Sequence, residues 1–204
     1  AESRGHGSPL LINGAGGMLA ISGGLPLGEG YAAMAFDASD EAGLNFETAA
    51  TIYNDLPGFD VTNLTSSSLQ LEVLSRPDLT QAGAPPRWLW YWNPATGAVA
   101  EAADDPDFFI LRKDLQGSLS FEQFTGGASS VLTLVDDAAS EPHGHYVRYA
   151  LDNVPAAAFG VYGFFARLLA PGSQPSQPVL LAFGYGAAGD QYAAGASAIN
   201  LAAG

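Results

Sequence analysis

The sequence predicts an all-β fold, a sandwich of about ten short, mostly antiparallel strands with a short C-terminal helix. Three observations carry this prediction. The 204 residues include 25 glycines and 13 prolines, and only 14% are charged, which favours short strands and turns over long helices. The hydrophobic fraction of 48% is enough for a sizeable core. Apolar runs of strand length alternate with turn signals, as in immunoglobulin-like or jelly-roll-like sandwiches.

The first half of the chain contains the clearest local signals. Residues 9–24 predict a hairpin, because Asn-Gly and Gly-Gly pairs separate two apolar runs. In residues 68–76, Leu69, Leu71 and Val73 alternate with Gln70, Glu72 and Leu74, which is the period-2 pattern of a strand with one inward face. Further strands are expected within 31–47 and 86–97, and residues 48–67 are rich in turn signals.

The second half of the chain continues the pattern of short strands. Residues 117–124 and 129–137 are predicted to pair as a hairpin, and the alanine-rich tail is predicted to form the short helix. The other expected strands lie near 107–113, 145–152, 159–171 and 178–186. Residues 1–9 are polar and glycine-rich and are interpreted as a flexible arm, and residues 10–204 as a single domain.

Charge and composition exclude several classes of function. The net charge is −14, from 21 acidic and 7 basic residues, so no basic stripe is present and nucleic-acid binding is not expected. The chain has no cysteine, which excludes disulfides, thiolate metal sites and cysteine nucleophiles. It also lacks the run of about 18 apolar residues that a membrane span needs. The start at Ala-Glu-Ser suggests a processed N-terminus, hence a protein that is secreted, periplasmic or on a bacterial cell surface.

The three histidines predict a metal site. His143 and His145 lie on either side of Gly144, and an extended backbone would place them on one face with Cα atoms about 7 Å apart. Neutral imidazole binds zinc and copper, but zinc normally takes four ligands. His6, in the glycine-flanked arm, is the expected third ligand, and Glu141 is a carboxylate candidate. Glu2, Asp136 and Asp137 are alternatives to Glu141, and ordinary surface histidines are the alternative to a site.

A row of tryptophans allows three interpretations. Trp88, Trp90 and Trp92 occupy alternate positions, so on a strand they would share one face. They are either a face of the core, an aromatic platform on which a sugar stacks, or a shield beside the metal site.

The acidic loops offer a calcium alternative, with Asp37, Asp40 and Glu41 as its candidate ligands. This segment lacks the alternating ligands and the closing glutamate of an EF-hand loop. No Gly-x-Ser-x-Gly motif is present and no ordered catalytic triad can be recognised, so the sequence predicts that the protein is not an enzyme and has no catalytic residues.

Several segments together resemble a known family. The stretches GHGSPLLI, TIYNDLPGFD, LWYWNPATG, HGHY, GVYGFFARL and PVLLAFGYG are similar to segments of exported bacterial proteins that the zinc-uptake regulator represses, many of which carry a PEP-type C-terminal sorting tail. The resemblance implies an exported metal-binding protein with His6, His143 and His145 on the matching positions. Compared with that group, the chain is poor in histidine, with three in 204 residues. The tryptophan-rich strand and the His-x-His pair are also similar to features of copper-repressible surface proteins of methanotrophs. The Trp-x-His arrangement of that group is absent.

The sequence therefore leads to three hypotheses of function. The first is an exported protein that captures a metal ion, zinc or else copper, through the His-x-His pair and His6. The second is a structural surface protein, such as a filament, surface-layer or matrix subunit, which self-associates through strand edges and is stapled by metal. The third is a carbohydrate-binding module that uses the tryptophan row.

Overall fold

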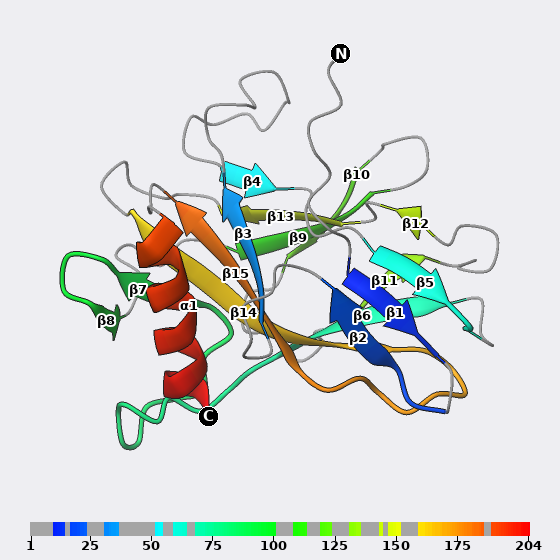
Figure 1. The fold of residues 1–204 in the computed structure, drawn as a ribbon, viewed down its shortest axis with the longest axis horizontal. Coiled ribbons are helices and arrows are strands. Elements are labelled where there is room, and N and C mark those ends of the chain that lie inside the picture. Colours follow the sequence, from blue (N-terminus) through cyan, green and yellow to red (C-terminus); the bar gives the residue numbers. More distant parts are fainter. Residues whose placement is uncertain are drawn as a thin grey trace, which may run out of the picture.

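The computed structural model shows a mostly β protein with one C-terminal helix among its described residues (Figure 1). The strands form three separate sheets. The prediction of a mostly β fold with a short C-terminal helix is confirmed. The described residues contain more strands than the ten that were expected. The structure describes residues 10–14, 17–23, 31–36, 52–54, 59–64, 68–100, 108–113, 119–123, 131–135, 143–144, 147–151, 159–185 and 189–204.

The largest sheet has seven strands and is mostly antiparallel. Its main path runs β11-β6-β14-β15-β3, with β7 pairing β14 and β8 pairing β7. Only β3 and β15 in this sheet run parallel to each other. The strands are β3 (Tyr31–Phe36), β6 (Leu69–Leu74), β7 (Trp90–Asn93), β8 (Ala98–Ala100), β11 (Val131–Val135), β14 (Gly160–Leu169) and β15 (Val179–Tyr185).

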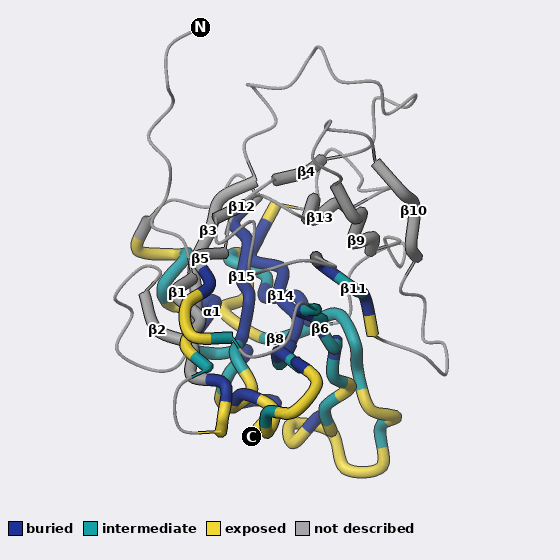
Figure 2. Tube along the Cα trace, turned by 90° about the vertical axis from the view of Figure 1, so that its right-hand side faces the viewer, coloured by how far each residue is buried: buried dark blue, intermediate teal, exposed yellow. Residues whose placement is uncertain are grey.

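The ten-residue strand β14 is the centre of this sheet. One of its edges pairs with β15, and the other pairs with β7 along Val161–Gly163 and with β6 along Phe165–Leu169. Its residues are buried almost throughout, which explains the unbroken apolar run in its sequence. Figure 2 shows the same burial along β14 and β15. The core of the described protein therefore lies on both faces of this sheet.

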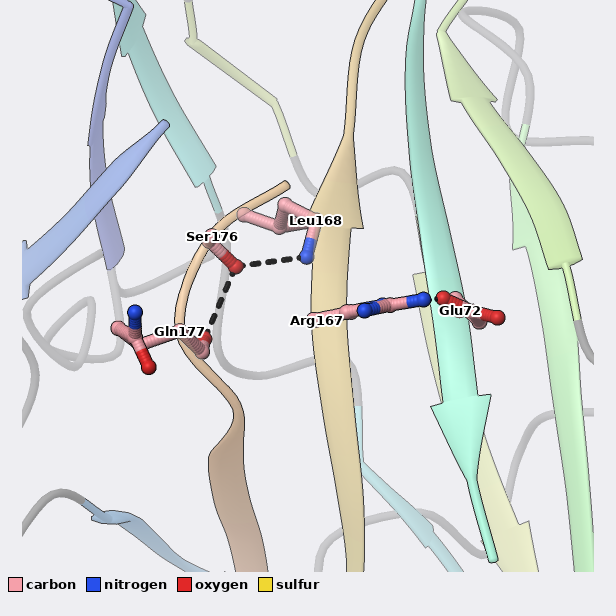
Figure 3. Close-up of polar contacts among 5 residues, drawn as sticks. All are labelled: Glu72, Arg167, Leu168, Ser176 and Gln177. Atoms are coloured by element: carbon pink, nitrogen blue, oxygen red, sulfur yellow. Dashed lines mark hydrogen bonds and ion pairs between the residues drawn. The ribbon is translucent and has the colours of Figure 1, made fainter. Parts of the chain in front are cut away.

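On β6 the predicted alternation is confirmed. Leu69, Leu71 and Val73 are at most 1% exposed, whereas the residues between them are partly exposed. The more exposed face carries an ion pair, because Glu72 on β6 lies opposite Arg167 on β14 (Figure 3).

Helix α1 (Gly189–Ala203) covers the face of the large sheet near β7, β14 and β15 (Figure 1). Asp190 lies in its first turn, where a negative charge is favourable, and the Tyr192 hydroxyl donates a hydrogen bond of 2.7 Å to the Ala182 carbonyl on β15. Its inward residues, Ala196, Ile199, Ala202 and Ala203, pack against Trp90, Trp92, Val161 and Leu180. In the described part of the chain, no helix has both the length and the apolarity that a membrane crossing requires.

Gly195 allows the helix to lie close to the sheet. A Cβ atom there would lie 2.6 Å from Val161 Cγ2 and 2.8 Å from Trp92 Cε3, and both side chains are buried in the core. Alanine normally favours a helix by up to about 1 kcal/mol over glycine. Here overpacking outweighs that gain, since neither buried neighbour has room to move.

We therefore expect Gly195→Ala to lower the free energy of unfolding by about 1–2 kcal/mol, measured by urea denaturation followed by circular dichroism. Leu201→Ala on the same helix is the control, because Leu201 is 76% exposed and should change stability by less than about 0.5 kcal/mol. A Gly195→Ala protein as stable as the wild type would show that the helix is not held this closely.

A loop between β6 and β7, here called the 76–87 loop, holds the end of the helix. Arg76 and Arg87 close its base with two backbone hydrogen bonds of 2.9 and 2.8 Å. The Leu79 amide donates to the Ala202 carbonyl at 2.8 Å, and the Arg76 guanidinium donates to the Gly204 carbonyl. The last turn of α1 contains no basic residue, so Arg76 supplies the positive charge that a helix C-terminus favours.

The second sheet has the strand order β10-β9-β13-β4 and is antiparallel. Its pairing corrects one prediction. Residues 117–124 and 129–137 do not form a hairpin, because β10 pairs with β9, whereas β11 belongs to the large sheet and pairs with β6. The strands are β4 (Ile52–Asn54), β9 (Phe108–Lys113), β10 (Leu119–Gln123) and β13 (Val147–Leu151).

The third sheet has the order β12-β5-β1-β2 and contains the predicted N-terminal hairpin. The strands are β1 (Leu10–Asn13), β2 (Ala20–Gly23), β5 (Phe59–Thr62) and β12 (His143–Gly144). The segment that links β14 to β15 connects this sheet to the large one. The Gln174 amide donates to the Gly17 carbonyl at 2.7 Å, and the Leu19 amide donates to the Gln174 carbonyl at 3.0 Å.

Buried Ser176 fixes that linking segment against β14 (Figure 3). Its hydroxyl accepts a hydrogen bond of 2.8 Å from the Leu168 amide and donates one of 3.0 Å to the Gln177 carbonyl. Its own amide donates to the Leu168 carbonyl at 3.0 Å. All these polar atoms are satisfied, so Ser176 is buried without an orphaned polar group.

Candidate metal centre

The predicted metal ligands fall only partly within the described residues. His143 lies on β12, whereas His6, His145 and Glu141 lie outside the described residues. Strand β12 (His143–Gly144) belongs to the third sheet and β13 (Val147–Leu151) to the second, and residues 145 and 146 between them lie outside the described residues. The calcium candidates Asp37, Asp40 and Glu41 also lie outside the described residues.

Backbone pairing places His143 directly opposite Asp60. Strand β12 runs antiparallel to β5, with His143 paired to Asp60 and Gly144 paired to Phe59. Residues directly opposite each other in an antiparallel pair share one face of the sheet, with Cβ atoms about 4.5–5.5 Å apart. An imidazole and a carboxylate, both of which zinc accepts as ligands, therefore occupy neighbouring positions.

The burial pattern along β5 identifies the face on which this pair lies. Val61 is only 4% exposed, whereas Thr62 is exposed. Successive residues of a strand alternate between faces, so Asp60 shares a face with Thr62 and lies opposite to Val61. His143 occupies the register position opposite Asp60 on β12.

The first strand lies on the other side of β5. It runs parallel to β5, with Leu10 paired to Phe59 and Leu11 paired to Asp60. Its end is polar, since the exposed Asn13 side chain accepts a hydrogen bond of 3.1 Å from Asn63. Phe59 thus has both Leu10 and Gly144 as cross-strand neighbours, so β1 and β12 lie on opposite sides of β5.

Two other described carboxylates form ion pairs with arginines. Asp78 pairs with Arg87 at 2.8 Å and Glu72 pairs with Arg167. No group of three or more histidine, aspartate or glutamate residues able to hold a metal is found among the residues that the structure describes.

The structure corrects the interpretation of the tryptophan row as a platform. Trp90 and Trp92 lie on β7 and are 0% and 6% exposed, and both belong to the core under helix α1. Trp88 precedes the strand and is partly buried. Two of the three rings thus offer no open face to a sugar, which agrees with the interpretation as a core face.

Sequence reasoning missed Asp60. The segment DLPGFD was interpreted as a sharp turn and as one of the acidic loops, and nothing local indicates that the residue after Phe59 is paired with His143. The alternation of an aspartate with Phe59 and Val61 is the signal that places it on an outer face, but its partner strand is distant in sequence.

Comparison with known proteins finds no family model that matches the chain, and no curated protein or solved structure that is significantly similar to it.

Proposed function

We propose that the protein is an exported metal-binding protein that captures a transition-metal ion, zinc first and copper second, by His143, His145 and His6. It acts by capture and release and not by catalytic turnover. One observation carries the proposal: β5 has the His-Gly segment of β12 on one side and the first strand of the chain on the other. The resemblance to exported proteins under zinc regulation points in the same direction.

The strand spacing makes a shared site feasible for the N-terminal arm. Neighbouring strands lie about 4.8 Å apart, so β12 and β1 are about 10 Å apart across β5. His6 precedes Leu10 by four residues, a length of chain that spans up to about 14 Å when extended. The arm therefore has the reach to bring a third imidazole to His143.

The buried faces of the large sheet bear on how the three sheets pack. We infer that the sheets pack as the layers of a sandwich. This is supported by Leu69, Leu71, Val73, Leu132 and Leu134, which are at most 1% exposed even though they belong to two neighbouring strands of one sheet. A second layer is the usual means of removing such a face from water.

Elemental mass spectrometry tests the proposed function. Protein purified without a histidine tag or chelators is expected to carry about one zinc or copper ion per chain. The double variant His143→Ala/His145→Ala is expected to lose the ion, since two imidazole ligands are removed. A His6→Ala variant should retain part of the affinity if the arm supplies only one ligand.

The control is Thr62→Ala, which changes an exposed residue of β5 and removes no histidine. It should leave the metal content unchanged. A wild-type protein without a transition metal, or a double variant with its metal unchanged, would contradict the proposal. The structural-subunit hypothesis would then be tested next, by electron microscopy of native material.

A further inference from the structure

The Asn-Gly pair at the end of β1 does not form a tight turn, although such pairs usually do. Asn13 is the last residue of the strand, where it pairs with Ala20 on β2 and with Thr62 on β5. The Gly14 amide continues the pairing with β5, because it donates a hydrogen bond of 3.1 Å to the Thr62 carbonyl. The pair is therefore held within the third sheet and not between its strands.

We propose that Asn13 is a modification site, which deamidates through the Gly14 nitrogen when β1 separates from β5. The Gly14 nitrogen loses its proton to hydroxide and attacks Cγ of Asn13. The new N–Cγ bond closes a succinimide ring, and the side-chain nitrogen leaves as ammonia with a proton taken from water. Water then opens the ring and leaves an aspartate or an isoaspartate. Glycine favours the attack, because it has no side chain to obstruct the approach of its nitrogen.

The closed sheet slows this reaction. The Gly14 N–H is bonded to the Thr62 carbonyl, so the attacking nitrogen keeps its proton. Asn13 is extended as a strand residue, and an extended backbone turns the Cβ–Cγ bond away from the next nitrogen. The Asn63 side chain donates a hydrogen bond of 3.1 Å to Asn13 Oδ1, which holds the Asn13 side chain in place. The reaction therefore requires the pairing to open.

The same contacts explain why these residues occupy this corner. A Cβ atom at Gly14 would lie 2.6 Å from the Asn63 carbonyl oxygen, so the close approach of the two chains requires glycine. Asn63 has a φ of 53°, in the left-handed region that asparagine tolerates better than most residues. Asn13 is exposed, so water and hydroxide reach its side chain once the backbone is released.

Modification acts on the third sheet in one direction. An isoaspartate lengthens the backbone by one methylene, so the pairing of position 13 with Ala20 and Thr62 cannot form again as before. Either product also adds a negative charge to a chain whose net charge is already −14. Each opening that leads to reaction therefore weakens the pairing that had slowed it. The proposal does not depend on a bound metal.

Peptide mapping of the full chain by mass spectrometry tests the proposal. The folded protein and the protein unfolded in guanidinium chloride are incubated at the same mildly alkaline pH, and conversion of Asn13 to the acid is followed with time. Asn13 is expected to react at least about tenfold faster in the unfolded chain, because a closed sheet exposes it only in rare openings. Asn200 is the internal control and should stay unmodified, because the bulky Leu201 follows it.

The Asn63→Gly variant tests the contact that holds the Asn13 side chain. Glycine adopts a positive φ without strain and removes the donor. Deamidation of the folded variant should be about two- to tenfold faster, the effect of one hydrogen bond on an opening equilibrium, and hydrogen exchange at the Gly14 amide should rise with it. Asn63→Asp retains the size of the side chain but cannot donate, and should act alike. Glu72→Ala, in the large sheet, is the control and should change neither rate.

Each contrary outcome removes a defined part of the proposal. No conversion of Asn13 in the unfolded chain would overturn the modification site. Equal rates in the folded and unfolded protein would overturn the protection by strand pairing. Unchanged rates in both Asn63 variants would overturn the role of that side chain. Faster deamidation without faster exchange at the Gly14 amide would show that the reaction proceeds in the closed sheet, and would overturn the opening step.

Discussion

Replacing Trp90 with alanine is expected to lower the free energy of unfolding by about 3–5 kcal/mol, the usual cost of removing a large aromatic side chain from a core. Trp90 is 0% exposed and belongs to the cluster that joins helix α1 to the large sheet. Its ring meets Phe165 edge to face at 6.3 Å, and the Arg87 guanidinium lies over it at 5.8 Å. The substitution removes these contacts and leaves a cavity beneath the helix.

Urea denaturation followed by tryptophan fluorescence and circular dichroism would measure this loss. Trp88→Ala is the matched control, because Trp88 is partly buried and precedes β7, and its removal should cost clearly less. Trp90→Phe should also lower the stability less than Trp90→Ala, because an aromatic ring still fills part of the space. It also removes the buried indole N–H, which lacks a hydrogen-bond partner. If Trp90→Ala were as stable as Trp88→Ala, the core position of this row would be wrong.

The role of the tryptophan row could be predicted from the sequence only in part. Alternation correctly placed Trp90 and Trp92 on one face of a strand. It could not show whether that face was covered, because the covering helix lies about a hundred residues further along the chain. A binding platform and a core face have the same local pattern, and only the tertiary structure separates them.

The strand pattern of β6 and the C-terminal helix could both be predicted from the sequence. Their signals are local: Leu69, Leu71 and Val73 alternate with polar or partly exposed residues, and the tail is rich in alanine. The pairing of β11 with β6, in place of a hairpin with β10, was not predictable, since strand propensity does not select a partner. The same limit concealed Asp60, whose position beside His143 depends on a long-range pairing.

Removing the carboxylate of Asp78 is the second change with a large expected effect. The Asp78 side chain is 0% exposed and that of Arg87 is 12% exposed, and they form an ion pair of 2.8 Å. Thr80 donates two further hydrogen bonds to the same carboxylate, of 2.9 Å from its amide and 2.6 Å from its hydroxyl. Breaking such a buried pair by removing one partner costs about 3–5 kcal/mol, because the remaining charge is buried without compensation. We expect this loss for Asp78→Ala in urea denaturation at pH 7.

The matched control is Glu72→Ala, which breaks the ion pair with Arg167. Those side chains are 21% and 38% exposed, so water screens the pair and its loss should cost about 0.2–1 kcal/mol. A cost for Asp78→Ala as small as that for Glu72→Ala would contradict the buried role of the pair.

Acid should reproduce part of the same loss in the wild type. Burial by itself would raise the pKa of the Asp78 carboxyl, but the hydrogen bonds from Thr80 and the charge of Arg87 outweigh it, so that its pKa lies below the ordinary 3.8. A carboxyl whose pKa is lowered by folding contributes stability above its unfolded pKa and loses it as the pH falls through the folded value. The stability difference between the wild type and Asp78→Asn should therefore be constant near neutrality and shrink below about pH 3.8. A difference that shrank already between pH 7 and 5 would assign the effect to another group.

The effect of Asp78→Ala should extend to the C-terminal end of helix α1, because the 76–87 loop contains Asp78 and also binds that end of the helix. Asp78 fixes Arg87 on one side of the loop base, and Arg76 on the other side binds the Gly204 carbonyl. Between them, the Leu79 amide bonds to the Ala202 carbonyl. Loss of the ion pair releases the loop, so Asp78→Ala should accelerate hydrogen exchange at the Leu79 amide, whereas Glu72→Ala should not. Exchange at Leu79 that was equally slow in both variants would show that the helix end is held independently of Asp78.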